Sequence, residues 1–334
     1  MIKRLTKILL YLVFFFPLLL VLVPQALAQT ELSTAASQNA LYDLSVNPPT
    51  SYLRIHPGNV ALHTITLKNN GQTTISVLPK IVDFVSDGST GQPILSKNSS
   101  FPYLDLNKTS IEKVQLPPGK TAQLTLHFSV PSTAENREFP LTVLFEAKLP
   151  DEPELETKVT GTIGSNLVVL VSDSDFLDQQ FTIDSFSNKP FIDSFQPLQF
   201  SPAVKNNTFA ASIASGSAKI TNWQGTVVAQ YDILPEVILG YSTRNIQPIA
   251  VAEDPNTLEE NNNGQRVFSF KSAFLFGPHT ISVYLPSGDP SNPQLIEYKK
   301  VVWAIPIAVL IAILVALILI SMYYVYRKRN FTDM

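Results

Sequence analysis

The 334-residue sequence contains no cysteine. Disulfide bonds, thiolate metal sites and cysteine nucleophiles are therefore excluded. If the chain is exported, each of its domains must be held together by its own hydrophobic core.

The sequence also has few of the groups that catalysis requires. Its four histidines do not form a zinc-binding spacing such as H-x-x-x-H or H-E-x-x-H. It has no G-x-S-x-G elbow, no convincing S-x-x-K set and no phosphate-binding glycine loop. We therefore expect a protein that is not an enzyme and uses no cofactor, with an extracellular hydrolase as the least supported alternative.

An excess of positive charge is missing as well. The chain has 24 Lys and Arg residues against 27 Asp and Glu residues, which gives a net charge of −3. A protein that binds nucleic acid needs a basic surface to neutralise phosphates, so we expect no nucleic acid partner.

Charge is absent altogether from Val301 to Tyr326. A run this long and apolar predicts a transmembrane helix, with the lipid bilayer as its partner. Trp303 at one end, and Tyr323, Tyr324 and Tyr326 at the other, are residues that favour the two membrane interfaces. The alternative is a helix buried in the core of a large soluble domain.

The N-terminus predicts the orientation of this helix. Residues 1–28 have a short basic start, an apolar run and a final Ala26-Leu27-Ala28, which is the pattern of a secretory signal peptide. Cleavage after Ala28 would place the mature N-terminus outside, and Arg327, Lys328 and Arg329 favour the cytoplasm for the tail at 327–334. An uncleaved signal anchor is the alternative. Residues 29–39 are polar and predict a flexible lead-in.

Short strands account for the pattern between the two apolar ends. In residues 40–172, Leu124, Leu126 and Phe128 alternate with polar residues, and 139–147 repeat this period of two. Turn signals separate the strands, notably His56-Pro57-Gly58-Asn59 and Pro117-Pro118-Gly119-Lys120. Strands at this spacing predict an antiparallel sandwich.

The pattern restarts in residues 173–298. We expect Ser215-Gly216 to turn the chain, Asn222 to Gly225 to form a hairpin tip, and 274–285 to contain a turn and a last long strand. The predicted fold is all-β, with two tandem Ig-like β-sandwich domains at 40–172 and 173–298, followed by a transmembrane helix at 301–326.

The order of these parts resembles a known family. The first domain opens with Leu41-Tyr42-Asp43-Leu44-Ser45-Val46-Asn47-Pro48-Pro49 and continues through Leu53 to Gly58 and the strand Thr64 to Asn70; the second contains Gly216 to Thr221 and Ile233-Leu234-Pro235. This resembles the WxL-interacting cell-surface proteins of Gram-positive bacteria. The resemblance implies a peptidoglycan-binding β domain, a host-binding β domain and a membrane anchor, and it assigns no ligand residue.

Three acidic residues lie where the two domains meet, at Asp173, Asp175 and Asp178. Carboxylate oxygens are the ligands that Ca²⁺ prefers, so this cluster is a candidate calcium site. The spacing of an EF-hand is absent, and a solvated linker is the alternative.

Two further groups are candidates for binding. Trp223, Tyr231 and Tyr241 have aromatic faces that can stack on a sugar ring, the alternative being packing in the core or at the hairpin tip. Ala304, Ala308, Ala312 and Ala316 recur at four-residue spacing, which places small side chains near one helix face where another helix can approach. Contact with lipid is the alternative for these alanines.

Together these features predict a single-pass, outward-facing binding or adhesion protein of a prokaryotic cell surface. Cell-wall peptidoglycan and other surface proteins are the candidate partners, contacted through sandwich edges and end loops. The alternative is an accessory subunit of a membrane or secretion complex that acts through its transmembrane helix.

Overall fold

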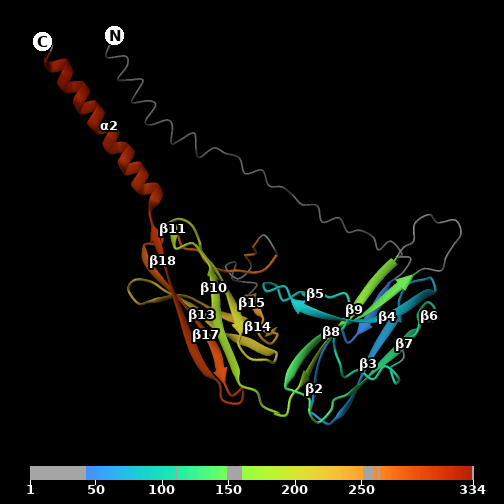
Figure 1. Cartoon of the computed structure of the whole chain (residues 1–334). Helices are drawn as coiled ribbons and strands as arrows, with labels where there is room; N and C mark the ends of the chain where they lie inside the picture. The colour runs from blue at the N-terminus through green and yellow to red at the C-terminus, as the bar shows by residue number, and fades with distance from the viewer. Residues whose placement is uncertain (1–42, 110, 149–159, 251–258, 262–263, 333–334) are drawn as a thin grey trace. The chain divides into compact units, whose positions relative to one another are not determined.

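A computed structural model describes residues 43–109, 111–148, 160–250, 259–261 and 264–332 (Figure 1). The signal peptide expected at 1–28 and the lead-in expected at 29–39 lie outside these residues. The described chain forms two Ig-like β-sandwiches and one C-terminal helix.

The first sandwich consists of two sheets. One sheet has the order β1-β3-β7, and the other has the order β2-β9-β8-β4, with β5 and β6 pairing with β4. The bounds are β1 (Leu44–Asn47), β2 (Thr50–Ile55), β3 (Val60–Asn69), β4 (Ile75–Ser86), β5 (Pro93–Leu95), β6 (Val114–Leu116), β7 (Thr121–Ser129), β8 (Arg137–Lys148) and β9 (Thr160–Val171). The chain leaves the first sheet after β1 and joins the second as β2, which pairs parallel to β9.

The predicted alternation places the core of this sandwich. Leu124, Leu126 and Phe128 of β7 are buried against the apolar side chains of β8 and β9, and Phe128 is 0% exposed. The intervening residues of β7 face outward, as a half-buried strand requires. The alternation predicted at 124–128 and at 139–147 is thereby confirmed as core packing.

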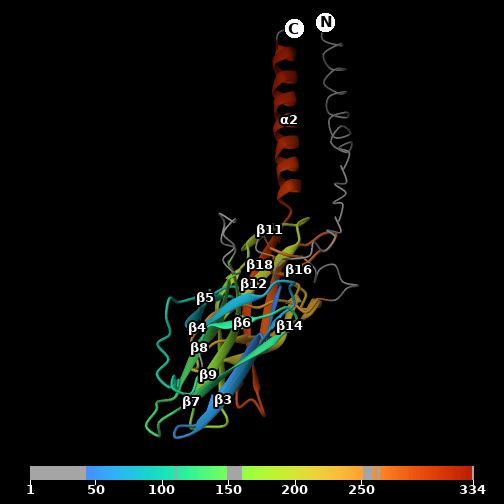
Figure 2. The same cartoon turned by 90° about the vertical axis from the view of Figure 1, so that its right-hand side faces the viewer.

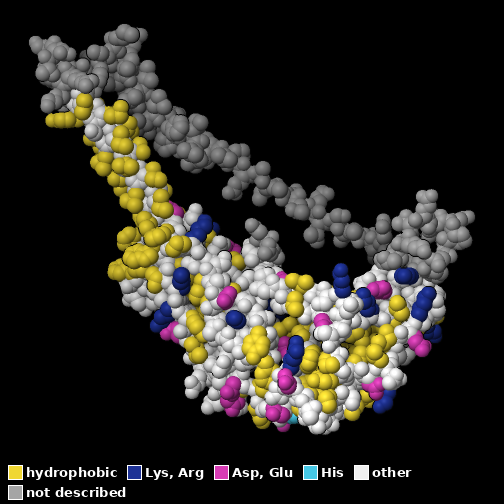
Figure 3. All heavy atoms as spheres, viewed as in Figure 1, with side chains coloured by type: hydrophobic (Ala, Val, Ile, Leu, Met, Phe, Trp, Pro, Cys, Tyr) yellow, Lys and Arg dark blue, Asp and Glu magenta, His cyan; other side chains and the backbone are white. Residues whose placement is uncertain are grey.

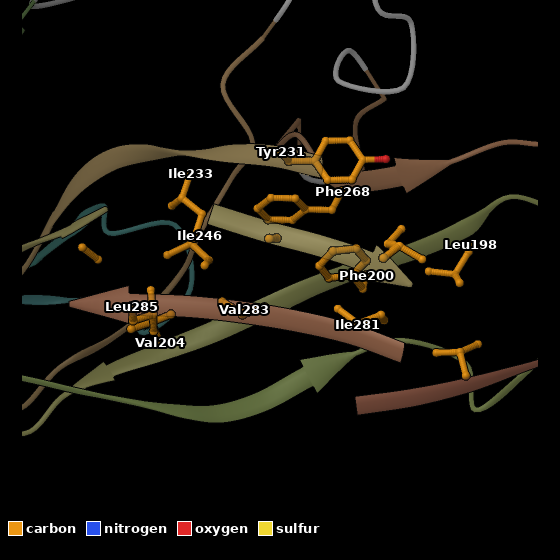
Figure 4. Close-up of a cluster of buried hydrophobic side chains, with 14 of the residues drawn as sticks. Leu198, Phe200, Val204, Tyr231, Ile233, Ile246, Phe268, Ile281, Val283 and Leu285 are labelled. Carbon is orange, nitrogen blue, oxygen red and sulfur yellow. The ribbon is translucent and has the colours of Figure 1, made fainter. Parts of the chain in front are cut away.

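The second sandwich also has two layers. One has the order β14-β13-β17-β18-β11, and the other pairs β10 with β12, which also pairs with β15 and β16. The two layers are continuous, because Gln179 and Gln180 at the start of β10 pair with the end of β17. The bounds are β10 (Gln179–Ser187), β11 (Phe191–Asp193), β12 (Leu198–Asn206), β13 (Ser212–Thr221), β14 (Val227–Ile238), β15 (Thr243–Asn245), β16 (Phe268–Phe270), β17 (Gly277–Gly288) and β18 (Gln294–Ile305). Its core is the cluster in Figure 4, where the rings of Phe200 and Phe268 stack at 4.8 Å.

The membrane-spanning candidate begins later than predicted. Val301 to Ile305 form the end of β18, and the helix α2 runs over Ile307–Thr332. Val302 and Ala304 are buried while Val301 and Trp303 are about half exposed, so this segment has the period of a strand. The prediction of a helix from 301 was wrong because all five residues are apolar, which hides their alternation.

Within α2, residues Ile307–Val325 are long and apolar enough to span a membrane. Their mean hydropathy is 2.8, and none of this segment is buried against the rest of the described chain. At about 1.5 Å per residue, these 19 residues extend roughly 28 Å, close to the thickness of a hydrocarbon core.

Two expectations for the second sandwich were wrong, one about its last strand and one about a turn. The strand expected within 274–285 is β17, and it is not the last one, because β18 follows it. Gly58 and Gly119 have positive φ in the two Pro-Gly turns, and Asn222 to Gly225 connect β13 to β14 as a hairpin tip. The turn expected at Ser215-Gly216 is instead a bulge within β13. Gly216 has φ 141°, and a Cβ there would lie 2.1 Å from the Tyr284 carbonyl oxygen, so glycine allows the close approach of β17.

An asparagine pair is repeated in the two sandwiches. The fully buried Asn69 and Asn206 each end the third strand of their sandwich, β3 and β12. Asn69 donates to the carbonyls of Thr73 and Leu116, both at 2.9 Å, and accepts the Gly71 N–H. Asn206 donates to the carbonyls of Ala210 at 2.8 Å and Ile238 at 3.0 Å, and accepts the Thr208 N–H. Each asparagine side chain therefore forms hydrogen bonds with backbone groups of a turn and of a neighbouring strand at the same time.

The residue that follows each buried asparagine repeats as well. Asn70 donates to the Ser45 hydroxyl at 3.1 Å, and Asn207 donates to the Thr182 hydroxyl at 3.0 Å. These contacts lie at the surface, where water competes for the same groups.

The β4–β5 loop is organised by one carboxylate. Asp87 accepts N–H groups of Ser89, Thr90 and Gly91 and the Thr90 hydroxyl. Burial opposes ionisation, but these hydrogen bonds prevail and lower the pKa of Asp87 from 3.8 to about 2. The Ser89 carbonyl of this loop accepts the Asn245 N–H at 2.8 Å, so Asp87 shapes a loop that contacts the second sandwich.

We expect Asn206→Ala to lower the free energy of unfolding by about 2–4 kcal/mol, because two buried carbonyls lose their donor. Asn207→Ala is the matched control and should change it by less than about 0.5 kcal/mol, since its contact is exposed. Urea unfolding of the two variants measures the difference. Equal losses would contradict the role given to the buried asparagine.

Asp87 also predicts a dependence of stability on pH. Its folded pKa lies below the unfolded value, so its contribution is present above pH 3.8 and is lost as the pH falls toward about 2. Asp87→Asn should remove this part of the acid sensitivity. The measurement is the urea midpoint of both proteins above and inside this window. A pH dependence that is the same in the variant would contradict the assignment.

Candidate functional site

The three aromatic candidates do not form one site. Trp223 lies at the hairpin tip before β14, and Tyr241 lies just after its other end. A strand of 12 residues spans about 40 Å, so these two exposed side chains are far apart. Tyr241 has φ 57° and belongs to a turn in which its N–H bonds the Thr208 carbonyl at 2.9 Å.

Tyr231 belongs to the core. It is 5% exposed, its ring meets Phe268 edge to face at 5.7 Å, and its hydroxyl donates to the Ser269 carbonyl at 2.5 Å (Figure 4). Its interpretation as a sugar-stacking residue was wrong. The apolar Ile233, two residues after Tyr231, contains the signal for a core position, because residues two apart on a strand share a face and both side chains are buried.

The linker carboxylates are engaged with separate side chains. The Asp173 carboxylate accepts the Asn136 amide at 2.7 Å, and the Asp175 carboxylate lies 3.1 Å from His56 Nε2. Arg54 additionally donates to the carbonyl of Asp175. In the described ranges, no group of three or more His, Cys, Asp or Glu side chains that could hold a metal ion is found. Asp178 does not join the other two carboxylates.

The alanine row is shorter than predicted. Ala304 lies in β18 and is 2% exposed, so it contributes to the sandwich and cannot serve as a helix contact. Ala308, Ala312 and Ala316 lie on α2 and are exposed. The helix-contact hypothesis therefore keeps three of its four residues.

An open hollow of about 460 Å³ lies between β2 and β9 of the first sandwich and the start of β13. Its wall is largely apolar, with Tyr52, Val168 and Ile213 among its lining residues. The Glu138 carboxylate accepts the N–H groups of Gly240, at 2.9 Å, and Ala211. Burial raises the pKa of Glu138, and these two N–H groups oppose the rise. Both carboxylate oxygens of Glu138 thus accept hydrogen bonds from the second sandwich. Glu138 is therefore not free to act as an acid or a base in the hollow.

The feature best suited to binding is the outer edge of β9. β8 pairs with β9 along its whole length, whereas β2 pairs only with Asn166 to Val171. Among the described strands, none pairs with the other side of Thr160 to Ser165. We call this six-residue segment the open edge.

The register shows which backbone groups the open edge presents. The Asn166 N–H points away from β8 and donates to the Pro49 carbonyl at 2.9 Å. Backbone direction alternates along a strand, so the N–H and C=O groups of Gly164, Thr162 and Thr160 also point away from β8. The Ser165 hydroxyl donates to the Pro48 carbonyl at 2.6 Å and marks where the open edge ends.

The open edge lacks the usual protection of an edge strand. Its sequence, TGTIGS, contains no charged residue and no proline. Natural proteins commonly blunt an exposed edge with lysine, proline or a bulge, because unpaired backbone groups attract other strands. The amino-acid pattern of β9 does not reveal the open edge, because the edge depends on where β2 joins the sheet.

No model of a known protein family matches the sequence, and no curated protein matches it. Among solved structures, the class 5 fimbriae chaperone CfaA is 14% identical, with 77% of this chain and 99% of that chain covered and a TM-score of 0.38. The Escherichia coli chaperone DraB is 10% identical, with 78% and 98% covered and a TM-score of 0.35. A protein of unknown function from Porphyromonas gingivalis is 12% identical, with 78% and 99% covered and a TM-score of 0.30. At these identities the similarity extends to the β fold alone.

We expect the open edge to be visible in amide hydrogen exchange. The amides of Thr162 and Gly164 should exchange faster than those of Ile163 and Ser165, whose N–H groups face β8. Residue-resolved exchange of the isolated full-length chain tests this expectation. Equal protection of the four amides would show that the open edge is already paired.

Proposed function

We propose that this protein is a membrane-anchored, outward-facing binding protein that takes an extended segment of another surface polypeptide as an added strand along the open edge of β9. It acts by binding and carries out no catalysis. The observation that carries the proposal is the uncharged half of β9, Thr160 to Ser165, whose outer side pairs with none of the described strands.

The backbone supplies the affinity of such an edge. Three residues offer an N–H and a C=O each, and an added strand engages these groups as β2 engages the other half of β9. The open edge spans about 20 Å at roughly 3.3 Å per residue. The start of β2 at Thr50 limits the added segment at one end.

The size of the open edge indicates where the partner lies. Six backbone hydrogen bonds at about 1 kcal/mol each give roughly 6 kcal/mol. Association costs at least about 4 kcal/mol, so the backbone alone supports only weak binding. Confinement of both partners to one membrane surface raises their effective concentration and offsets this deficit. A second protein at the same membrane is therefore favoured over a free peptide.

The anchor in this proposal is α2. Its apolar part is not buried against the rest of the described chain, which is expected of a helix surrounded by lipid. The proposed orientation, with the sandwiches outside, depends on the basic residues after Tyr326 and on the signal-like N-terminus.

Cell-wall peptidoglycan remains the alternative ligand. Sugar recognition commonly uses aromatic faces that converge, and here Tyr231 is buried while Trp223 and Tyr241 lie at opposite ends of β14. The open edge instead suits a polypeptide, because its offered groups repeat with the spacing of a peptide backbone.

The test compares two substitutions at Thr162 in the full-length chain, produced in its native host and chemically crosslinked at the cell surface. Thr162→Pro removes an outward N–H and keeps every bond to β8, and proline is tolerated on edge strands. Thr162→Val keeps the N–H and is the matched control. We expect Thr162→Pro to recover at least tenfold less partner than either the wild type or Thr162→Val.

Urea unfolding of both variants checks that the sandwich is intact. Undiminished partner recovery by a folded Thr162→Pro variant would overturn the proposal. The absence of any crosslinked polypeptide on the wild-type chain would overturn it as well and would favour a wall polymer as the ligand.

A further inference from the structure

A group of large apolar side chains is exposed at one end of the second sandwich. We call it the aromatic collar, and its members are Phe191, Phe195, Trp223, Phe274, Phe276 and Trp303. Each is between 47% and 58% exposed. Figure 3 shows hydrophobic side chains gathered at the end of the second sandwich where α2 begins. A contiguous apolar patch of this kind commonly marks an interaction surface.

Strand register and ring contacts hold the collar together. Trp303 is paired with Phe191 on one side and with Pro278 on the other. The ring of Phe274 meets that of Phe195 at 5.5 Å and stacks on that of Phe276 at 6.4 Å. The Trp223 side chain lies against Gly277, where a Cβ would be 3.4 Å from its Cδ1. The six side chains thus share one end of the sandwich.

The collar adjoins the first turn of the apolar helix. Only Pro306 separates the end of β18 from the start of α2. The Asp193 carboxylate accepts the Ala308 N–H at 3.1 Å, and the Ser194 N–H donates to the Ile305 carbonyl at 3.1 Å. Figures 1 and 2 both show β11 and β18 at the foot of α2. The sandwich and the helix are therefore joined without a flexible linker.

We propose that the aromatic collar lies within the headgroup layer of the bilayer, so that the second sandwich is partly immersed in the membrane and is held by lipid as well as by its helix. This inference rests on the membrane anchoring in the proposed function. It adds a second contact with the membrane, made by the folded domain itself.

The dimensions of the membrane agree with this position. The headgroup layer adds roughly 5–8 Å on each side of the hydrocarbon core. Trp303 precedes the last strand residue, Ile305, by about 7 Å at 3.3 Å per residue. A helix that begins its span near Ile307 therefore places the collar at headgroup depth.

The chemistry of the collar also favours lipid over a protein partner. Tryptophan and other aromatic rings are enriched at membrane interfaces, where their apolar faces and polar edges are both accommodated. Lys189 and Lys271 are exposed and lie within three residues of Phe191 and Phe274 in the sequence. Such cations interact with lipid phosphates and with anionic headgroups. Trp223, read from the sequence as a sugar-stacking candidate, thereby receives a different role.

The native chain carries its own probe, because both of its tryptophans belong to the collar. The full-length protein is reconstituted in phosphatidylcholine–phosphatidylglycerol vesicles whose acyl chains are brominated either near the glycerol or near their middle. We expect lipids brominated near the glycerol to quench most of the tryptophan emission. Mid-chain bromine should quench it less, and aqueous acrylamide should quench it only weakly.

Two labelled variants distinguish the collar from the anchor. The chain has no cysteine, so Leu314→Cys in α2 and Leu62→Cys in β3 each provide one site for a bimane fluorophore. Mid-chain bromine should quench the label at 314, whereas the label at 62 should respond only to aqueous quenchers. A label at 314 that responds to aqueous quenchers would show that the membrane anchoring itself is wrong.

Two results would overturn the collar proposal and leave the anchoring intact. Tryptophan emission that is quenched by acrylamide and not by bromine, with the label at 314 in lipid, would place the collar in water. Emission that neither reagent quenches would show that the collar is covered by a second copy of the chain or by another protein.

Discussion

The parallel pairing of β2 with β9 fixes the rest of the first sandwich. Pro49 accepts the Asn166 N–H and Pro48 accepts the Ser165 hydroxyl, so the chain joins β9 only from its midpoint onward. β8 cannot pair with the outer side of Thr160 to Ser165, because it already occupies the opposite side of β9 along its whole length. The backbone groups of Thr160, Thr162 and Gly164 are left to water or to another chain. The proposed function depends on these backbone groups and requires no catalytic side chain.

A protein without cysteine must hold its domains by packing and by satisfied polar groups, and both sandwiches do so in the same way. Each has one continuous core, and each buries an asparagine that bonds a turn and a neighbouring strand. The second sandwich adds a direct joint to the helix through Asp193. The backbone N–H groups of Phe195 and Ala308 lower the pKa of Asp193, because both hydrogen bonds favour the ionised carboxylate. A membrane contact by the collar would immobilise the sandwich further.

Residue alternation was sufficient to predict the β class and the core strands, because polar residues separate Leu124, Leu126 and Phe128. It failed between Val301 and Ile305, where every residue is apolar and a strand resembles the start of a helix. Single residues were harder to assign: Tyr231 is a core residue and Trp223 a surface one, although both are aromatic and near in sequence. The open edge could not be predicted, since edge status depends on pairing between residues that are more than 100 positions apart.

The central claim is that a partner adds a strand to the open edge, and the most direct test is to map that strand. Because the chain has no cysteine, Thr160→Cys and Thr162→Cys can each carry a photoreactive group in the full-length protein in its native membrane. Strand pairing predicts that both positions crosslink to one segment of one polypeptide, with the two adducts displaced by two residues along the partner's sequence. Adducts scattered over unrelated segments, or adducts no more frequent than those from Glu146→Cys, a position of β8 that pairs with β4 on one side and β9 on the other, would contradict the account.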